Sequence, residues 1–193
     1  MKAGGGHRKG LQFERRICID LSRWWTDGKR DDVFWRSPQS GGRATSRAKK
    51  GISTFGHYGD VQAVDPIGRP LLELMTIELK CGYVGTSPLD LIDGQVGSVW
   101  GKWLYHLVKD ANSAGSRFWA LIVQRPRRKS VIVVPELLCR TAGVLIPAHN
   151  DQIMVDWQGY GDCLMIFRLM TFFDWCHPAN IKDALLSSVG GVS

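Results

Sequence analysis

The chain has 193 residues, 44% of them hydrophobic and 22% charged, which suits one compact core and excludes a disordered protein. Its net charge of +7 is concentrated in residues 1–60, where 13 Lys and Arg stand against 6 Asp and Glu, while the other residues carry 12 of each sign. Localised positive charge favours a polyanionic partner, and a solubilising basic tail is the plain alternative.

Cysteine and hydropathy patterns exclude several other classes of protein. The five cysteines are scattered and include no CxxC pair, which argues against a structural zinc site and against a disulfide framework. No apolar run approaches the roughly 18 residues that a membrane span needs. We therefore expect a cytoplasmic protein that is not associated with a membrane.

The first half of the chain predicts one helix and three strands. Phe13, Ile17, Leu21 and Trp24 recur at helical spacing and predict a helix at about 10–25. A short strand is predicted at 33–35, followed by a long basic segment rich in Ser and Gly at 37–57. A second strand at 60–64, a turn at 65–68 and a third strand at 70–80 complete this half.

The second half predicts a helix, a hairpin and a less regular C-terminal part. The helix is expected at about 95–113 and the hairpin strands at 118–123 and 131–134. A short helix, a strand pair near 153–168 and a helix near 178–188 complete the prediction. This order indicates an α/β fold with a mixed central sheet flanked by helices.

Three charged residues form the candidate catalytic set. Glu78 and Lys80 are two apart in the third strand, so both side chains project to the same face. Asp60 opens the preceding strand, and antiparallel pairing through the 65–68 turn would bring its carboxylate beside them. Two carboxylates and an amine suit Mg²⁺, which takes oxygen ligands together with water and phosphate. The alternative is an exposed ion pair between Glu78 and Lys80 with Asp60 as a turn residue.

These residues resemble a known nuclease signature. Gly59-Asp60 followed by Ile77-Glu78-Leu79-Lys80 resembles the PD-(D/E)XK motif. The upstream pattern resembles more specifically archaeal-type Holliday-junction resolvases and their phage relatives; it consists of Lys9-Gly10, Glu14-Arg15, Arg36 and Ser40-Gly41-Gly42. The resemblance covers about residues 8–135. It implies a restriction-endonuclease-like core within a single nuclease domain, 1–193, with a C-terminal extension at about 136–193.

The resemblance implies a role for each matching residue. Asp60 and Glu78 would hold Mg²⁺, for which Mn²⁺ would substitute, and Lys80 would be the catalytic lysine. Glu14 would be a further acidic residue at the metal, and its alternative is a solvated helix position. Ser40 would act at the scissile phosphate; it lies far from Asp60, so Ser46 and Ser53 are rivals. The expected DNA-binding residues are Arg36, Arg43, Arg47, Lys49 and Lys50.

The predicted function is that of a metal-dependent endodeoxyribonuclease acting on branched DNA such as a four-way junction, in DNA recombination. We expect a homodimer in the cytoplasm, the host cytoplasm if a phage encodes it. Trp100, Trp103 and residues 172–175 offer apolar material for the dimer interface, and the alternative is that they pack within one chain. The runner-up functions are another nuclease on the same fold (restriction, repair or end processing) and a DNA-binding module without catalysis.

Three further features of the sequence have weaker functional readings. Trp24 and Trp25 could form a stacking platform for bases. The basic turn 125–129 could contact a DNA arm through phosphates, and a charged hairpin tip is the alternative. His57, Tyr58, Gln95 and Lys102 lie where they could reach substrate, although loop packing or a solvated face is the simpler reading.

Overall fold

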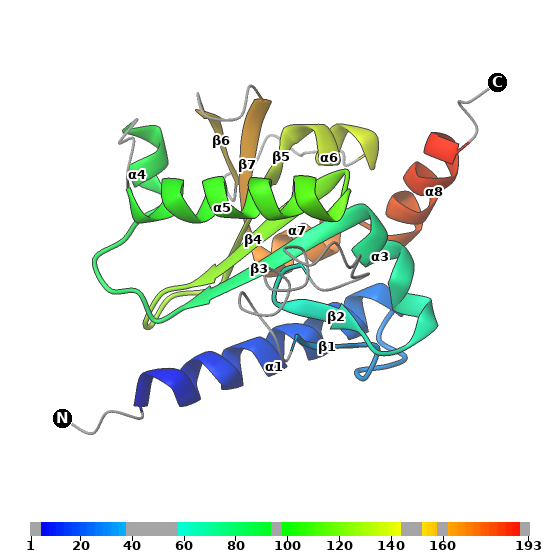
Figure 1. The fold of residues 1–193 in the computed structure, drawn as a ribbon, viewed down its shortest axis with the longest axis horizontal. Coiled ribbons are helices and arrows are strands. Elements are labelled where there is room, and N and C mark those ends of the chain that lie inside the picture. Colours follow the sequence, from blue (N-terminus) through cyan, green and yellow to red (C-terminus); the bar gives the residue numbers. More distant parts are fainter. Residues whose placement is uncertain (1–4, 38–57, 94–97, 144–151, 158–161, 190–193) are drawn as a thin grey trace, which may run out of the picture.

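The computed structural model describes residues 5–37, 58–93, 98–143, 152–157 and 162–189 (Figure 1). The helices and strands follow one another as α1 (Gly5–Trp25), β1 (Phe34–Arg36), β2 (Val61–Ala63), η1 (Pro66–Gly68), α3 (Arg69–Leu74), β3 (Met75–Cys81), α4 (Leu89–Ile92), α5 (Val99–Ala114), β4 (Phe118–Gln124), β5 (Val131–Pro135), α6 (Glu136–Thr141), β6 (Gln152–Trp157), β7 (Asp162–Arg168), α7 (Leu169–Trp175) and α8 (Pro178–Val189). Within these ranges, every helix is too short or too polar to cross a lipid bilayer.

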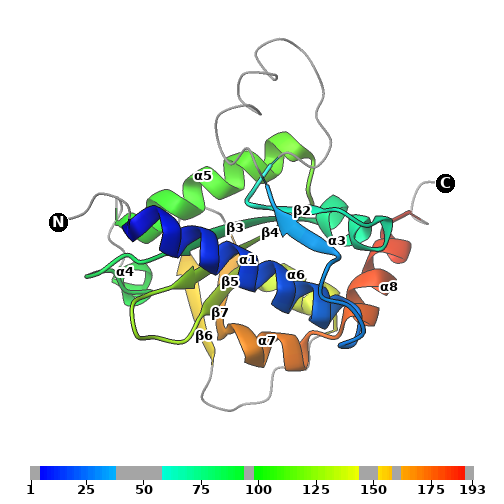
Figure 2. The same cartoon turned by 90° about the horizontal axis from the view of Figure 1, so that it is seen from below.

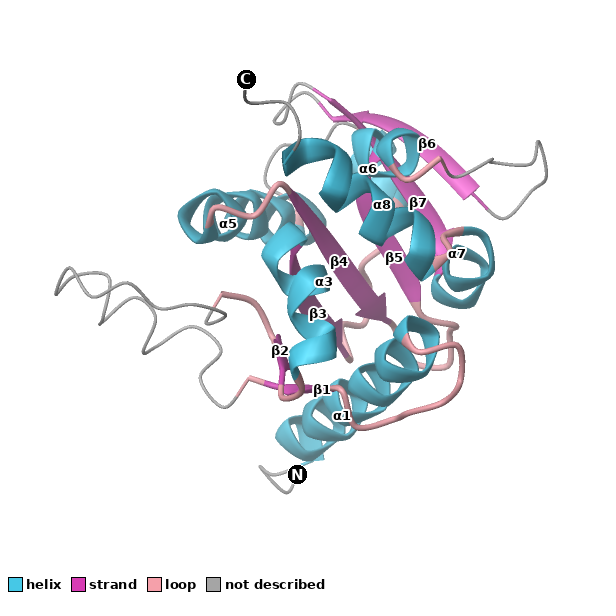
Figure 3. Ribbon diagram, turned by 90° about the vertical axis from the view of Figure 1, so that its right-hand side faces the viewer, coloured by secondary structure: helices cyan, strands magenta, loops and turns pink. Residues whose placement is uncertain are grey.

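Five strands form a mixed sheet in the order β3-β4-β5-β7-β6 (Figure 3). β3 and β4 are parallel, and the other neighbours are antiparallel. β1 and β2 form a separate antiparallel pair. The parallel β3–β4 connection runs through α5, as such connections require a long crossover. The predicted α/β fold with a mixed sheet flanked by helices is confirmed.

Alternating side chains divide the interior into two hydrophobic layers, one on each face of the sheet. In β4, Phe118, Ala120 and Ile122 join the layer that contains α1, α3, α6, α7 and α8. Trp119, Leu121 and Val123 face the opposite way and pack against α5. Figure 1 and Figure 2 show α1 and α5 on opposite sides of the strands. This two-sided burial explains the continuous apolar sequence of β4.

The predicted strand at 70–80 is wrong in its first half. Residues 66–74 form η1 and α3 instead, and only Met75–Cys81 is a strand. Pro66 and Pro70 stand in the first turns of the two helical segments, where the missing N–H costs nothing. Leu71 and Leu74, three apart, are both buried by the helix. The expected antiparallel pairing of this strand with the Asp60 strand is also wrong, since β2 pairs with β1 and β3 with β4.

Most of the tryptophans considered for DNA stacking or a dimer interface pack inside the chain. Trp25 and Trp100 are buried, as are Phe172 and Phe173. Trp24 stacks on Phe173 with 5.0 Å between ring centroids and donates its indole N–H to the carbonyl of Cys176. The stacking platform is therefore not available at Trp24 and Trp25, and Trp100, Phe172 and Phe173 belong to the core.

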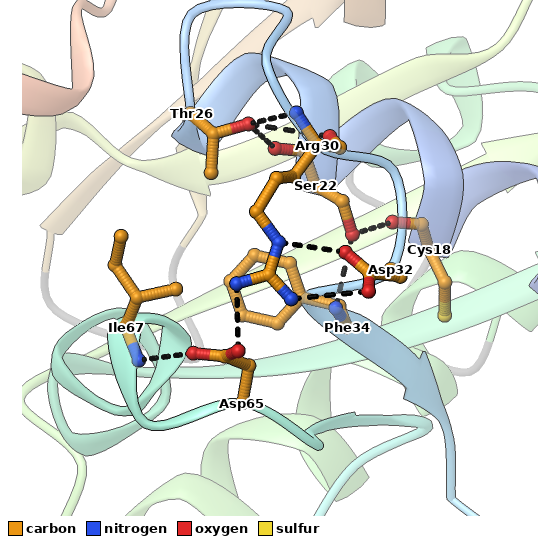
Figure 4. Close-up of polar contacts among 8 residues, drawn as sticks. All are labelled: Cys18, Ser22, Thr26, Arg30, Asp32, Phe34, Asp65 and Ile67. Atoms are coloured by element: carbon orange, nitrogen blue, oxygen red, sulfur yellow. Dashed lines mark hydrogen bonds and ion pairs between the residues drawn. The ribbon is translucent and has the colours of Figure 1, made fainter.

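Arg30 connects the end of α1 to both short strands (Figure 4). Its Nη1 donates to Asp65 Oδ2 at 2.7 Å, and its Nε donates to Asp32 Oδ1 at 2.8 Å. Asp65 also accepts the backbone N–H of Ile67 and thereby caps η1. The backbone N–H of Arg30 donates to Thr26 Oγ1 at 3.0 Å. These bonds hold the chain before β1 and after β2 against α1.

Ser22 makes the buried counterpart of this connection (Figure 4). Its hydroxyl donates to the Cys18 carbonyl at 2.7 Å and accepts the Phe34 N–H at 2.9 Å. Because Phe34 opens β1 and is fully buried, its N–H has this hydroxyl in place of water. The α1–β1 junction therefore depends on one side-chain oxygen.

Replacing Ser22 with Ala should lower the free energy of unfolding by about 1–3 kcal/mol, because the Phe34 N–H would remain buried without a partner. Ser113→Ala is the matched control: Ser113 also donates to the carbonyl four residues earlier, but it is exposed. The control should change stability by less than about 0.5 kcal/mol. Urea titration of both variants measures the difference, and equal losses would contradict the role of Ser22.

Candidate active site

Glu78 and Lys80 lie on β3, the edge strand of the five-stranded sheet. Their neighbours Ile77 and Leu79 point into the α1 layer, so Glu78 and Lys80 project to the α5 side. Both side chains are mostly buried, with 21% and 24% of their surface exposed, and Lys80 Nζ pairs with Glu78 Oε1. The predicted common face is confirmed.

Asp60 occupies the free edge of β3. Its backbone N–H donates to the Ile77 carbonyl at 2.8 Å, and its Oδ2 accepts the Leu79 N–H at 2.8 Å. The carboxylate oxygen thus accepts the hydrogen bond that a backbone carbonyl of a neighbouring strand would accept in a wider sheet. Asp60 is 7% exposed. Asp60 thus lies at the edge of the strand that carries Glu78 and Lys80, although a strand pairing other than the predicted one brings it there.

Gly59 permits this close approach. Its φ of +84° lies in the left-handed region, and a Cβ at this position would stand 2.5 Å from the Ile77 carbonyl oxygen. A glycine is required here for two reasons, the backbone conformation and the absence of space. Because the obstructing atom is backbone in the sheet, it cannot move aside as a flexible side chain could.

Gly59→Ala should displace Asp60 from β3 and lower both activity and stability. Gly82→Ala is the matched control, because Gly82 has a similar φ of +89° but a Cβ added there would meet no atom within 4 Å. Both variants carry the cost of left-handed alanine, about 1–2 kcal/mol. Gly59→Ala should lose about 2 kcal/mol more, by overpacking against the strand. Thermal or urea unfolding compares them, and equal destabilisation would show that Gly59 is needed for its φ alone.

The three charged groups perturb one another strongly. Burial and the charge of Asp60 raise the pKa of Glu78 to about 7, against the attraction of Lys80. Burial also raises the pKa of Asp60, although the Leu79 N–H and Lys80 oppose the shift. Burial would lower the pKa of Lys80, but Glu78 and Asp60 outweigh it and raise that pKa. Asp60 and Glu78 therefore lie close enough for the charge of each to act on its neighbours at this edge of the sheet.

The raised pKa of Glu78 predicts a pH-dependent stability of the metal-free protein. Below pH 4.5, the pKa of Glu78 in the unfolded chain, the carboxyl is protonated in both the folded and the unfolded state. Between pH 4.5 and pH 7 the unfolded chain loses this proton before the folded protein does, so the free energy of unfolding falls as pH rises. Glu78→Gln removes this loss. In EDTA, the free energy of unfolding of Glu78→Gln relative to wild type should increase between pH 5 and pH 8 by on the order of 2 kcal/mol. A difference that does not vary with pH would contradict the shift.

Glu14 and Arg36 lie beside the set without joining it directly. Arg36 Nη1 is 3.8 Å from Glu14 Oε2, so the helix residue pairs with the β1 arginine. The charge of Glu14 contributes to the raised pKa of Asp60. Ser37, which follows Arg36, donates its N–H to the Asp60 carbonyl at 2.8 Å. Glu14 and Arg36 are thus neighbours of Asp60, as the sequence pattern led us to expect.

Several predicted site residues lie outside the described residues. These are Ser40 with its rivals Ser46 and Ser53, the loop cations Arg43, Arg47, Lys49 and Lys50, and also His57 and Gln95. Tyr58 is partly buried and Lys102 is exposed on α5. The loop cations and the phosphate-contacting serine stay predictions.

A basic surface that sequence reasoning did not identify as one unit lies beyond the end of β3. Arg16 of α1 donates to the Gln124 side chain at 2.8 Å, and Gln124 in turn donates to the Arg128 carbonyl in the β4–β5 turn. The charges of Arg16 and Lys9 both act on Cys81, which ends β3. Figure 1 and Figure 2 show the first turns of α1 next to this turn. Two basic segments over 100 residues apart therefore form one surface.

The carboxylate pair fits a divalent cation. Asp60 and Glu78 each have one oxygen engaged, by the Leu79 N–H and by Lys80 respectively. Two carboxylates at the edge of a strand are ligands that Mg²⁺ uses together with water and phosphate oxygens. Among the described residues, no three His, Cys, Asp or Glu side chains are grouped as a complete ligand set.

The mixed sheet and the Asp60, Glu78 and Lys80 geometry are those of a PD-(D/E)XK-type nuclease. The family model described as "Phage putative PDDEXK endonuclease" matches residues 5–181. The chain belongs to this family of phage PD-(D/E)XK endonucleases. The match continues past residue 135, where the recognised sequence pattern ended. No curated protein and no solved structure gives a significant match.

Proposed function

We propose that the protein is a Mg²⁺-dependent endonuclease that hydrolyses phosphodiester bonds in branched DNA, such as a four-way junction. The observation that carries the nuclease chemistry is the buried Asp60 carboxylate, bound to the Leu79 N–H at the edge of β3, beside the half-buried ion pair of Glu78 and Lys80. Burying such a cluster costs stability, and the hydrophobic layers on both sides of it do not require it. A cost of this kind is typical of functional sites.

Each residue of the cluster has a separate task. Asp60 and Glu78 would hold Mg²⁺, with Mn²⁺ as a substitute, and Glu14 would add negative charge nearby. The bound ion would activate water and stabilise charge developing on phosphorus. Lys80 carries a proton at neutral pH in the metal-free protein, since its pKa is raised. As an ammonium it would offset the charge of the scissile phosphate and orient the attacking water.

DNA binding would combine two groups of basic residues. The first is the predicted group Arg36, Arg43, Arg47, Lys49 and Lys50, together with the hydroxyl of Ser40 at the phosphate. The second is the exposed surface made by Lys9 and Arg16 of α1 and by the β4–β5 turn. Such side chains contact phosphates and position the duplex without reading its sequence. Of the first group, Arg36 lies on β1 next to Glu14, and the second group lies beyond the end of β3.

The choice of branched DNA rests on the resolvase-like pattern in residues 9–42. A four-way junction has two strands of like polarity to cut, and one chain carries one cluster. A two-fold homodimer would supply two clusters at a fixed separation, and such symmetric pairs are the commonest oligomers. Since Trp100, Phe172 and Phe173 are core residues, the interface would use other surfaces.

A cleavage assay on four labelled substrates tests this proposal: a four-way junction, a flap, a duplex and a single strand, each with Mg²⁺. We expect the junction to be cut fastest, and sedimentation of the same mixture to contain two chains per junction. Asp60→Asn and Glu78→Gln should each reduce cleavage at least about 100-fold, since they remove a charged metal ligand. Both variants should still bind the junction through the basic residues.

The outcomes separate the parts of the proposal. Full activity in Asp60→Asn or Glu78→Gln would overturn the active site. Preference for the flap or the duplex would replace junction resolution with end processing or restriction-like cleavage, and so would a monomer on the junction. Tight junction binding with no cleavage of any substrate by wild type would mean a DNA-binding module. Asp174→Asn, an exposed α7 residue, is the control for the loss of one negative charge.

A further inference from the structure

Helix α5 runs beside β3, on the side of the sheet that carries Glu78 and Lys80 (Figure 1). Two contacts fix its register. Thr76 Oγ1 donates to Ser116 Oγ at 2.9 Å, and the rings of Tyr83 and Trp103 meet edge to face with centroids 4.6 Å apart. At strand and helix spacing the intervals 76–83 and 103–116 would span about 23 Å and about 20 Å. β3 ends at Cys81 and α5 at Ala114, so Tyr83 and Ser116 lie two residues beyond them, and the two contacts indicate that α5 runs antiparallel to β3.

This register places the middle of α5 opposite the catalytic pair. Glu78 and Lys80 lie about 7 Å and about 13 Å beyond Thr76 along the strand. Counted back from Ser116 at about 1.5 Å per residue, the matching points on the helix fall near residues 111 and 107. Asp110 lies within this interval.

Asp110 is an exposed residue on the flank of α5 that is nearer to β3. The helix buries Trp100, Leu104, Leu107 and Ala111 against the sheet. One flank, with Tyr105, Val108 and Asn112, lines a hollow shared with Trp157 of β6. Trp103 and Asp110 are two turns apart on the other flank, which meets Tyr83 just beyond β3.

Charge interactions agree with this placement. Burial and the charge of Asp60 raise the pKa of Glu78, Lys80 lowers it, and the charge of Asp110 makes a smaller contribution that raises it. Burial raises the pKa of Asp110 itself, while His106, Lys109 and Lys80 lower it. Asp110 therefore interacts with both residues of the catalytic pair although it comes from another element of the fold.

We propose that Asp110 is a further acidic residue of the active site, in addition to Asp60, Glu78 and Glu14, and that it binds water of the divalent cation that Asp60 and Glu78 would hold. The inference rests on the proposed function. Asp110 would be a positioning residue: it would act through water, in keeping with the absence of a three-residue ligand set among the described side chains. Mg²⁺ retains several waters, and groups that bind such waters orient them and tune the affinity of the site.

The test measures Mn²⁺ binding to the full chain without DNA, with electron paramagnetic resonance as the signal. Asp110→Asn should weaken Mn²⁺ binding about 10-fold, the size of effect that residues around metal ligands have. Asp174→Asn should bind like wild type, since Asp174 is exposed on α7 in the opposite layer. Asp60→Asn should lose more affinity than Asp110→Asn. Metal-free thermal unfolding of each variant verifies that it is folded.

The inference and the proposed function fail in different ways. Wild-type Mn²⁺ affinity in Asp110→Asn, with affinity lost in Asp60→Asn, would overturn the role of Asp110 and leave the active site intact. Wild-type affinity in Asp60→Asn and Glu78→Gln would overturn both. An equal loss in Asp110→Asn and Asp174→Asn would reduce the effect to general electrostatics and would also overturn the inference.

Discussion

The two hydrogen bonds between Asp60 and the edge of β3 are the interaction on which the site depends. They use the backbone N–H and one carboxylate oxygen of Asp60 to bind the Ile77 carbonyl and the Leu79 N–H. The free edge of a sheet strand presents unpaired backbone groups. Here that edge holds a carboxylate in position beside Glu78, and Gly59 allows the chain to come close enough. The same contact therefore covers the free edge of β3 and positions the Asp60 carboxylate in the candidate site.

The surrounding fold supplies rigidity to a cluster that is unfavourable by itself. Two adjoining carboxyls in a partly buried place repel each other, and Lys80 offsets that repulsion only in part. The hydrophobic layers on both faces of the sheet, and the hydrogen bonds from α1 to β1 and η1, hold the cluster in place. A divalent cation would convert the repulsion into binding. We propose that the cluster lowers the stability of the metal-free protein and that binding of the ion would offset this cost.

The sequence predicted the cluster more reliably than the path of the chain that builds it. The i, i+2 spacing of Glu78 and Lys80 determines a common face in any strand, so this part did not depend on topology. The apolar residues Leu71, Leu72 and Leu74 alone do not distinguish a strand from a helix. They form a helix because α3 begins at Arg69, with Pro70 in its first turn, and buries Leu71 and Leu74. Asp110 could not be found from sequence, because its place depends on how α5 is registered against β3. The number of tryptophans alone likewise did not show which of them lie in the core of one chain and which lie at a dimer interface.

A crystal structure of the protein soaked in Mn²⁺, with anomalous diffraction measured near the Mn absorption edge, tests the central claim most directly. We expect one strong anomalous peak per chain, between the carboxyl groups of Asp60 and Glu78 at the edge of β3, and no such peak in Asp60→Asn crystals. A peak elsewhere in the chain, or none between these two carboxyls at saturating Mn²⁺, would contradict the proposed active site.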